Sequence, residues 1–449
     1  MSIDLKTPLN KSVHLDLKGV PPTPERLLSL LDVFKGLGFN SVLVEWEDTF
    51  PWTVDERFRS STAYSPECIT EFCRKAKTLD LEVIPLIQCL GHMENTLSVP
   101  GYEHLREIAD NESGLDPMAP GARELIQSMV DDVMKLMPEV KYFHLGGDEA
   151  RTLGQGEESG PYAKQYGKAK LYMRHVEPLL DDLMKKGIQP MLWHDMMIDW
   201  SGEELSALSK KCDLVVWAYG GDPASNGKHC NEEMIQKFKK HGCQLWGAGA
   251  YKGAEGYDAD LPDLALHVEN TLGWVNLSKK IELEGLIATA WSRYAVDTIQ
   301  CNPIDSSLDS MASFSIIMKG GSRIEGVREE ALAVLDQMGE KERFIDCSTI
   351  MKELSTCKKD GWEKVQHARQ VLTLAKNDPA RTSAKNPNLG LHAMVSLKKI
   401  IENGEEIHIK AKQVFEGLME TVWLDEYFNT RLQPLKDELV EITNQYKSL

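Results

Sequence analysis

Eight short apolar runs alternate with amphipathic helical patterns between residue 12 and about residue 320. This alternation constrains the fold more than any other feature, because strands that alternate with helices favour a parallel sheet. Eight strands favour closure into an α/β barrel of the (β/α)8 TIM type over an open sheet. No Gly-x-Gly-x-x-Gly motif follows the first run, which further disfavours a dinucleotide-binding sheet. The expected strands are Val13–Leu17, Ser41–Trp46, Glu82–Gln88, Tyr142–Gly146, Gln189–His194, Leu214–Ala218, Gln244–Ala250 and Leu286–Trp291.

The pattern changes near Gly326, after which no strand is expected and five stretches read as amphipathic helices. We therefore predict a catalytic barrel over residues 1–325 and an α-helical C-terminal domain over residues 326–449. A turn-rich segment over 377–388 separates the middle helices. Whether these helices pair two copies of the chain into a homodimer is left open. The expected helices are Glu329–Met338, Trp362–Ala375, Met394–Ile401, Ile407–Met419 and Leu435–Tyr446.

The charge balance excludes some classes of partner. The 51 Lys and Arg residues against 69 Asp and Glu give a net charge of −18, which argues against nucleic acid and anionic membranes as partners. The nine cysteines are dispersed and never form a Cys-x-x-Cys pair, so reduced core thiols are expected rather than disulfides or zinc ligands. No stretch reaches the roughly 20 apolar residues of a spanning helix, and the N-terminal residues form no signal-peptide pattern. We therefore expect a cytoplasmic protein.

Polar and aromatic residues gather where the expected strands end. In (β/α)8 barrels the loops after the strands carry the chemistry, so these residues are the candidate site. Aromatic rings at several strand ends could enclose the apolar face of a sugar, although packing in the barrel core is the simpler explanation for any single tryptophan. The residues are Glu45, Asp48, His92, Asp148, Glu149, Trp193, Asp195, Trp217, Tyr219, Tyr251, Trp291 and Arg293.

Asp148 and Glu149 are adjacent carboxylates that follow Gly146 and Gly147 at the end of the fourth expected strand. Neighbouring side chains on a regular strand point to opposite faces, but two glycines permit backbone angles that bring both acids into one cavity. Two like charges at close range raise one pKa, which leaves one carboxylate and one protonated acid. Glycosidic bond cleavage uses such a pair. Taken alone, the pair would favour a simpler explanation, the start of a helix where acids are favoured by the dipole, and it is the surrounding residues that reverse this.

The run HLGGDE at 144–149 resembles the His-x-Gly-Gly-Asp-Glu motif of the family 20 glycoside hydrolases, the β-N-acetylhexosaminidases. CLGHMEN at 89–95 and the tryptophans that end strands five, six and eight strengthen the resemblance, which is to the hexosaminidase D-like branch and covers the whole barrel. The resemblance implies removal of a terminal β-linked N-acetylhexosamine with retention of configuration. It implies no cofactor and no metal.

The resemblance also implies a role for each candidate. Glu149 would be the general acid, with its pKa kept high by Asp148 and by burial. Asp148 would accept the acetamido N–H while the acetamido carbonyl attacks the anomeric carbon. Tyr251, or else Tyr219, would donate its hydroxyl to the acetamido oxygen. The tryptophans Trp193, Trp217 and Trp291 would enclose the acetamido group and stack on the ring, and His92 and His144 would orient Asp148 or neighbouring loops.

The chain departs from the family pattern at two places. Many members carry an arginine after the first strand that holds sugar hydroxyls, whereas this chain has Lys18 and Gly19 there, and Gly253 stands where an acid is expected. Recognition of the sugar hydroxyls would then fall to other residues: Glu45, Asp48, His14 or Arg293. In the hexosaminidase D-like branch this accompanies a preference for N-acetylgalactosamine over N-acetylglucosamine.

Three alternatives remain. A hydrolase of O-GlcNAc-modified protein uses related chemistry, but such enzymes carry paired aspartates rather than Asp-Glu. A metal-dependent barrel enzyme could use Asp148, Glu149, His144 and Asp195 as ligands. A non-catalytic sugar-binding barrel would keep the aromatic box without needing an acid at Glu149.

Overall fold

The computed structural model describes residues 10–320, 325–378 and 390–447, and its centre is a closed barrel of eight parallel strands. Each of the eight expected strands is present, so the predicted (β/α)8 barrel is confirmed. The closing pair joins the first and last strands, with Val13 beside Ala288. Around the barrel the order is β1-β12-β11-β8-β7-β6-β3-β2. The strands are β1 (Asn10–Asp16), β2 (Ser41–Glu45), β3 (Glu82–Leu86), β6 (Tyr142–His144), β7 (Gln189–Trp193), β8 (Asp213–Trp217), β11 (Leu245–Lys252) and β12 (Gly285–Ala290).

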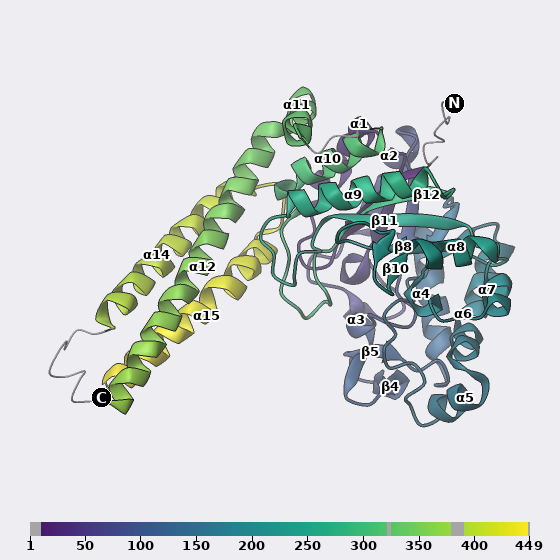
Figure 1. Cartoon of the computed structure of the whole chain (residues 1–449), viewed down its shortest axis with the longest axis horizontal. Helices are drawn as coiled ribbons and strands as arrows, with labels where there is room; N and C mark the ends of the chain where they lie inside the picture. Colours follow the sequence, from purple (N-terminus) through teal and green to yellow (C-terminus); the bar gives the residue numbers. More distant parts are fainter. Residues whose placement is uncertain (1–9, 321–324, 379–389, 448–449) are drawn as a thin grey trace.

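Helices surround the barrel (Figure 1). Two of them, α1 (Pro24–Leu37) and α2 (Pro66–Thr78), begin at recognisable caps. Thr23 and Ser65 each accept a hydrogen bond from a first-turn N–H, and a proline occupies the first turn of both helices. These caps fix where α1 and α2 begin. The barrel helices are α1 (Pro24–Leu37), α2 (Pro66–Thr78), α3 (Glu94–Leu97), α4 (Ala122–Leu136), α5 (Ser159–Tyr166), α6 (Lys168–Lys185), α7 (Gly202–Leu208), α8 (Glu232–Lys240), α9 (Leu264–Ser278) and α10 (Leu308–Met318).

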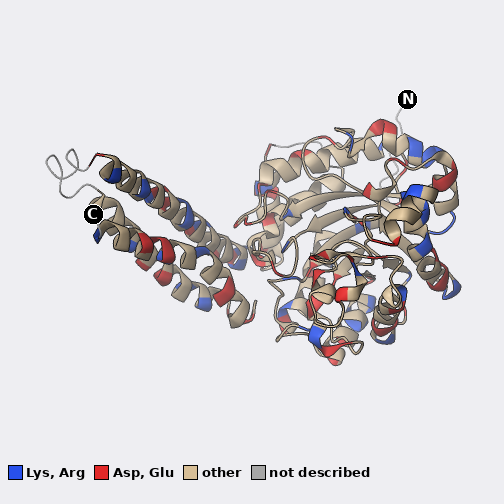
Figure 2. Ribbon diagram, turned by 90° about the horizontal axis from the view of Figure 1, so that it is seen from below, with Lys and Arg blue, Asp and Glu red and all other residues tan. Residues whose placement is uncertain are grey.

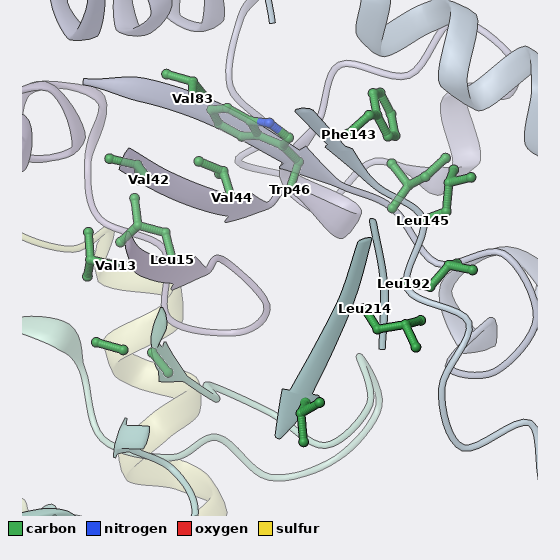
Figure 3. Close-up of a cluster of buried hydrophobic side chains, with 14 of the residues drawn as sticks. Val13, Leu15, Val42, Val44, Trp46, Val83, Phe143, Leu145, Leu192 and Leu214 are labelled. Atoms are coloured by element: carbon green, nitrogen blue, oxygen red, sulfur yellow. The ribbon is translucent and has the colours of Figure 1, made fainter. Parts of the chain in front are cut away.

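Alternation along each strand divides the barrel into two apolar layers. Figure 3 shows side chains of the outer layer, including Val42, Val44 and Leu192, which belong to the core between sheet and helices. Their neighbours Leu43 and Met191 fill the barrel interior. The inner layer ends, at the carboxyl ends of the strands, in polar and aromatic residues rather than aliphatic ones. This change of chemistry leaves the top of the barrel open to a ligand.

In the connections that the structure describes lie two small antiparallel sheets and five short 3-10 helices, and the sequence patterns do not predict the sheets. They are β4 (Arg106–Ile108) with β5 (Asn111–Leu115) and β9 (Ser225–Asn226) with β10 (Cys230–Asn231). The 3-10 helices are η1 (Glu47–Thr49), η2 (Glu56–Phe58), η3 (Glu103–Leu105), η4 (Asp195–Met197) and η5 (Ile304–Ser306).

Three long C-terminal helices form an arm that projects from one side of the barrel (Figure 1). They are α12 (Lys341–Asn377), α14 (Leu391–Val414) and α15 (Thr421–Lys447). Acidic and basic residues are interspersed along them (Figure 2), and ion pairs such as Arg369–Glu438 at 2.7 Å join neighbouring helices. Most of the turn-rich segment 377–388 lies outside the described residues.

The helix before the arm belongs to the barrel core. Val327, Ala331 and Leu335 of α11 (Val327–Gln337) pack in the same core as the barrel strands. The arm's own apolar clusters begin with Cys347 on α12. The expected division between residues 325 and 326 therefore precedes a helix that is packed on the barrel. None of the helices in the described ranges has the length and apolar character needed to cross a membrane.

Candidate active site

The carboxyl ends of the barrel strands enclose a cavity of about 400 Å³. The structure brings most of the predicted site residues together there, from strands that are far apart in the sequence. The predicted residues that line it are Glu45, His92, Asp148, Glu149, Trp217, Tyr219, Trp291 and Arg293.

Unusual backbone angles place Asp148 and Glu149 in the same cavity. Gly146 and Gly147 have φ values of 59° and 81°, and Glu149 itself has a φ of 44°. A Cβ on Gly146 would lie 1.9 Å from Oε1 of Gln88, so a side chain there would have to displace the Gln88 amide as well as adopt a strained backbone conformation. The two glycines thus do what the sequence predicts: they let adjacent acids face one cavity.

His92 lies between the two acids. Its Nε2 is 3.7 Å from Oδ2 of Asp148 and 3.5 Å from Oε2 of Glu149. Burial lowers the pKa of His92, but the two carboxylates outweigh it and raise the pKa to about 9. Burial raises the pKa of Asp148 to about 7, with His92 opposing the shift and Asp195 and Glu149 adding to it. At neutral pH the imidazole is therefore a cation beside a partly protonated Asp148.

Glu149 is held as an anion. Its Oε1 accepts a 2.6 Å hydrogen bond from Arg151 and its Oε2 accepts one of 3.0 Å from the hydroxyl of Tyr294. Burial alone would raise the pKa of Glu149, but the hydrogen bonds from His92 and Arg151 lower it to about 2. The sequence predicts the opposite order, with Glu149 protonated. The difference arises from His92 and Arg151, whose contacts with Glu149 the sequence does not predict.

A buried charged group lies on another wall of the cavity. Nζ of Lys18 is 2.8 Å from Oε1 of Glu45 and 3.1 Å from Oδ1 of Asp16. Gln88 donates its amide to Glu45 at 3.0 Å, while its own Oε1 has no hydrogen-bond partner among the described residues. Burial lowers the pKa of Lys18, but Asp16 and Glu45 outweigh it and raise the pKa, so the side chain stays charged. Lys18 thus supplies the cation where an arginine was expected.

Three predicted residues support the cavity without lining it. Trp193 and His144 lie below it in the barrel interior, with ring centroids 4.3 Å apart. Nδ1 of His144 accepts a 2.9 Å hydrogen bond from the Gly146 N–H, and burial lowers its pKa to about 3, so this ring is neutral. Asp195 accepts hydrogen bonds from the Glu149 N–H at 2.9 Å and from the Trp217 indole at 3.4 Å.

Three further predicted residues do not line the cavity: Tyr251, Asp48 and His14. His14 is fully buried, with its Nε2 3.6 Å from Oε2 of Glu45. Tyr251 is fully buried in the layer between sheet and helices, and its hydroxyl donates to the carbonyl oxygen of His14 at 3.3 Å. Because side chains alternate along a strand, Tyr251 points outward to the helices, as Leu245 does. Tyr219 points inward, as Val215 and Trp217 do. Asp48 also lies outside the lining, and burial raises its pKa to about 6.

Several lining residues were not among the predicted ones: Lys18, Gln88, Tyr257 and Tyr294. Gln88 ends the third expected strand and was recognisable by position. Tyr294 follows the eighth expected strand and was recognisable in the same way, whereas Tyr257 lies in a connection after β11 whose path no periodicity reveals. A Cβ on Gly253 would lie 1.9 Å from the Trp291 carbonyl oxygen, so this wall is backbone where family members carry an acid.

The metal-dependent alternative gains no support from the geometry. Across residues 10–320, 325–378 and 390–447, no three His, Cys, Asp or Glu side chains are grouped to hold a metal ion.

Comparison with known sequences finds one matching family and clear relatives. Residues 46–242 match the glycosyl hydrolase family 20 catalytic domain. The chain is 35% identical over 327 residues to a protein named hexosaminidase D from Bos taurus, covering 70% of this chain and 94% of that protein. It is 33% identical over 321 residues to hexosaminidase D from Homo sapiens, covering 69% of this chain and 65% of that protein.

Solved structures with the same fold are more distant in sequence. A chitobiase from Flavobacterium johnsoniae superposes with a TM-score of 0.56 at 14% identity, covering 97% of this chain and 72% of that one. A β-N-acetylhexosaminidase from Bacteroides fragilis gives a TM-score of 0.55 at 14% identity, covering 74% and 70%. At these identities the similarity concerns the fold.

Proposed function

Because this chain belongs to glycosyl hydrolase family 20 and is a glycoside hydrolase of the β-N-acetylhexosaminidase type, we propose that it removes terminal β-linked N-acetylhexosamine by substrate-assisted catalysis. The observation that supports this most directly is the acid pair: Asp148 and Glu149 line one cavity with Trp217, Tyr219 and Trp291. In the proposed reaction the 2-acetamido oxygen attacks the anomeric carbon and the glycosidic bond breaks. Water then opens the oxazolinium intermediate, which returns the original configuration.

The two acids divide the work. Asp148 accepts the acetamido N–H and stabilises the positive charge of the intermediate. Glu149 protonates the leaving oxygen and then removes a proton from the attacking water. The buried position of Asp148, with an exposed fraction of 6%, supports the first role, since a buried carboxylate interacts strongly with a nearby cation.

The acid pair needs a single proton for this reaction. Without substrate that proton resides on Asp148, since Glu149 is held as an anion by Arg151 and His92. A substrate amide that donates to Asp148 stabilises its anion. The side chain of Arg151 is 71% exposed, so a leaving group that enters beside Glu149 can take the place of this contact at small cost. We infer that substrate binding moves the proton from Asp148 to Glu149.

Tyr219 replaces Tyr251 as the proposed donor to the acetamido oxygen. Its ring stacks on Trp217 with centroids 5.2 Å apart and lies 6.2 Å from the Trp291 ring. Burial raises the pKa of Tyr219 well above its usual value, so the hydroxyl keeps its proton. Trp217 and Trp291 then enclose the acetamido group, and Trp193 lies beneath them.

In this proposal Lys18, Glu45 and Gln88, with Arg293 beside them, bind the hydroxyl groups of the sugar. We propose a preference for N-acetylgalactosamine, as the resemblance to the hexosaminidase D-like branch implies. Comparison of kcat/KM on the two p-nitrophenyl sugars tests this, and a clear preference for the glucosamine would overturn it.

One comparison tests the proposed reaction. The enzyme should hydrolyse a chromogenic β-N-acetylgalactosaminide and leave the plain β-galactoside, which has no acetamido group, essentially untouched. A thiazoline mimic of the oxazolinium should inhibit well below millimolar concentration. Glu149→Gln should lower turnover by roughly 10²–10⁴-fold. Rapid cleavage of the plain galactoside, or no inhibition by the thiazoline, would contradict the substrate-assisted step.

We also propose a cytoplasmic location. All nine cysteines are free thiols, and seven of them are buried, which suits a reducing compartment.

A further inference from the structure

Tyr257 is an exposed aromatic residue at the mouth of the cavity. Its side chain lines the cavity although 67% of the residue is exposed, the largest exposed fraction among the large apolar side chains of the described residues. Its ring meets that of Tyr294 edge to face, with centroids 5.3 Å apart. An aromatic face that opens on both a cavity and solvent is suited to stack on a sugar ring.

The contact with Glu149 indicates that these tyrosines lie on the leaving-group side of the cavity. The Tyr294 hydroxyl donates to Oε2 of Glu149 at 3.0 Å. In the proposed function Glu149 delivers its proton to the glycosidic oxygen, so the group attached to that oxygen must pass beside Tyr294. The tryptophans and Tyr219 gather instead with Asp148, on the side of the sugar that is released.

Arg151 adds polar donors to the same region. Its guanidinium contacts Oε1 of Glu149 at 2.6 Å while most of the side chain is in solvent. The other N–H groups of a guanidinium remain available to hydroxyls that approach from outside.

The loop that carries Tyr257 is fastened to the arm. Lys358 of α12 lies 2.9 Å from Oδ2 of both Asp258 and Asp260. Tyr427 of α15 donates to Oδ1 of Asp260 at 2.9 Å, and Arg431 pairs with the same carboxylate. A platform whose neighbours are fixed loses less entropy when it binds a ligand.

We propose that Tyr257 and Tyr294, together with Arg151, form a subsite for the first sugar of the leaving group. The substrate class is then a glycan that ends in N-acetylhexosamine, with a second pyranose ring stacked on Tyr257. This inference rests on the proposed function, because it takes Glu149 as the proton donor.

The test compares two substrates on matched variants. One is a disaccharide of N-acetylgalactosamine β-linked to galactose, and the other is the methyl β-glycoside of N-acetylgalactosamine, which has no second ring. Tyr257→Ala should lower the ratio of kcat/KM for disaccharide over methyl glycoside by roughly 3- to 10-fold, the loss expected for one stacking contact. Tyr257→Phe, which keeps the ring, should hold the ratio within about twofold.

Tyr166 is the matched control, because it is an exposed tyrosine, 46% accessible, that does not line the cavity. Tyr166→Ala should leave both rates unchanged. An unaltered ratio in Tyr257→Ala would overturn the subsite. Inhibition by the thiazoline, which fills only the hexosamine position, separates the two failures: if it inhibits all variants equally while the ratio stays constant, the proposed function stands and the subsite falls.

Discussion

The backbone N–H of Glu149 donates a hydrogen bond of 2.9 Å to Oδ2 of Asp195. Glu149 has a φ of 44°, a conformation that costs a non-glycine residue energy unless its surroundings hold it. Asp195 also accepts from the indole of Trp217 at 3.4 Å. One carboxylate thus fixes both the proposed proton donor and one wall of the sugar site.

Asp195→Ala should lower kcat by about 10²-fold, because a misplacement of the acid by about 1 Å is enough for such a loss. KM should change less, since most lining residues stay in place. Asp195→Asn keeps an oxygen for one of the two hydrogen bonds and should lose less activity than the alanine variant. Steady-state kinetics with the chromogenic substrate provide the measurement. Equal activity of Asp195→Ala and wild type would show that Glu149 holds its position without this contact.

The pH profile of kcat/KM should have an alkaline limb near pH 7. This limb reports the free enzyme, in which the single proton of the acid pair resides on Asp148, whose pKa burial raises to about 7. Above that pH the proton is lost and no acid remains for catalysis. Below it activity should persist to low pH, because the pKa of Glu149 is only about 2. An optimum well above pH 8 would contradict the shared proton.

The two tyrosine candidates give opposite expectations. Tyr219→Phe removes the proposed donor to the acetamido oxygen and should lower kcat by roughly 10²-fold. Tyr251→Phe removes a hydroxyl that bonds to the His14 carbonyl oxygen, outside the cavity, and should leave kcat within about twofold. The same substrate and conditions serve both variants. The reverse outcome would return Tyr251 to the role that the sequence predicts.

Asp148→Asn should stabilise the protein at alkaline pH. A carboxyl group whose pKa is raised on folding, here from 3.8 to about 7, favours the folded state fully below its unfolded pKa and loses that contribution as the pH rises to about 7. The asparagine variant carries no such titration. Its melting temperature relative to wild type should therefore be higher at pH 8 than at pH 4. No change in this difference between the two pH values would contradict the raised pKa.

Removal of one partner of the Arg431–Asp260 pair should destabilise the protein. Both side chains are buried, and Arg431 also donates to the carbonyl oxygen of Gln300 at 2.6 Å. Arg431→Met should cost unfolding free energy, up to about 3–5 kcal/mol, because it removes one of the two cations that pair with the buried Asp260 carboxylate and leaves only Lys358. The double variant Arg431→Met/Asp260→Leu should regain part of the loss. Urea unfolding measures both, and a double variant no more stable than the single one would contradict the explanation by an incompletely paired charge.

Much of the barrel and of its site could be predicted, because local patterns indicate where each strand ends and which of its side chains point inward. Trp217, Trp291 and the acid pair follow directly from their positions after apolar runs. The alternation of side chains also distinguishes the two tyrosines, since Tyr219 lies two residues after Trp217 and points to the same side. The prediction of Tyr251 relied instead on the resemblance to the family. The order of the two carboxyl pKa values depends on His92 and Arg151, whose contacts with Glu149 no periodicity reveals.

In the arm, the sequence predicts the end of a helix at the wrong place. The sequence suggests a break between Ile401 and Ile407, yet α14 continues through Gly404. A Cβ at Gly404 would lie 2.6 Å from Cδ2 of Leu432 on α15, so this glycine permits close packing of two helices rather than ending one. Local signals cannot separate these two uses of glycine.

The ion pairs between barrel and arm bear on how the chain could be shortened. Arg293, at the edge of the cavity, pairs with Glu426 of α15 at 2.5 Å, and Asp258 and Asp260 take their cations from α12 and α15. A barrel expressed alone would keep both residues of the acid pair. The charged residues at its entrance, however, would lose the ion-pair partners that α12 and α15 provide. The unit that must be produced for any crystallographic or kinetic work on substrate entry is accordingly the barrel with its three helices attached.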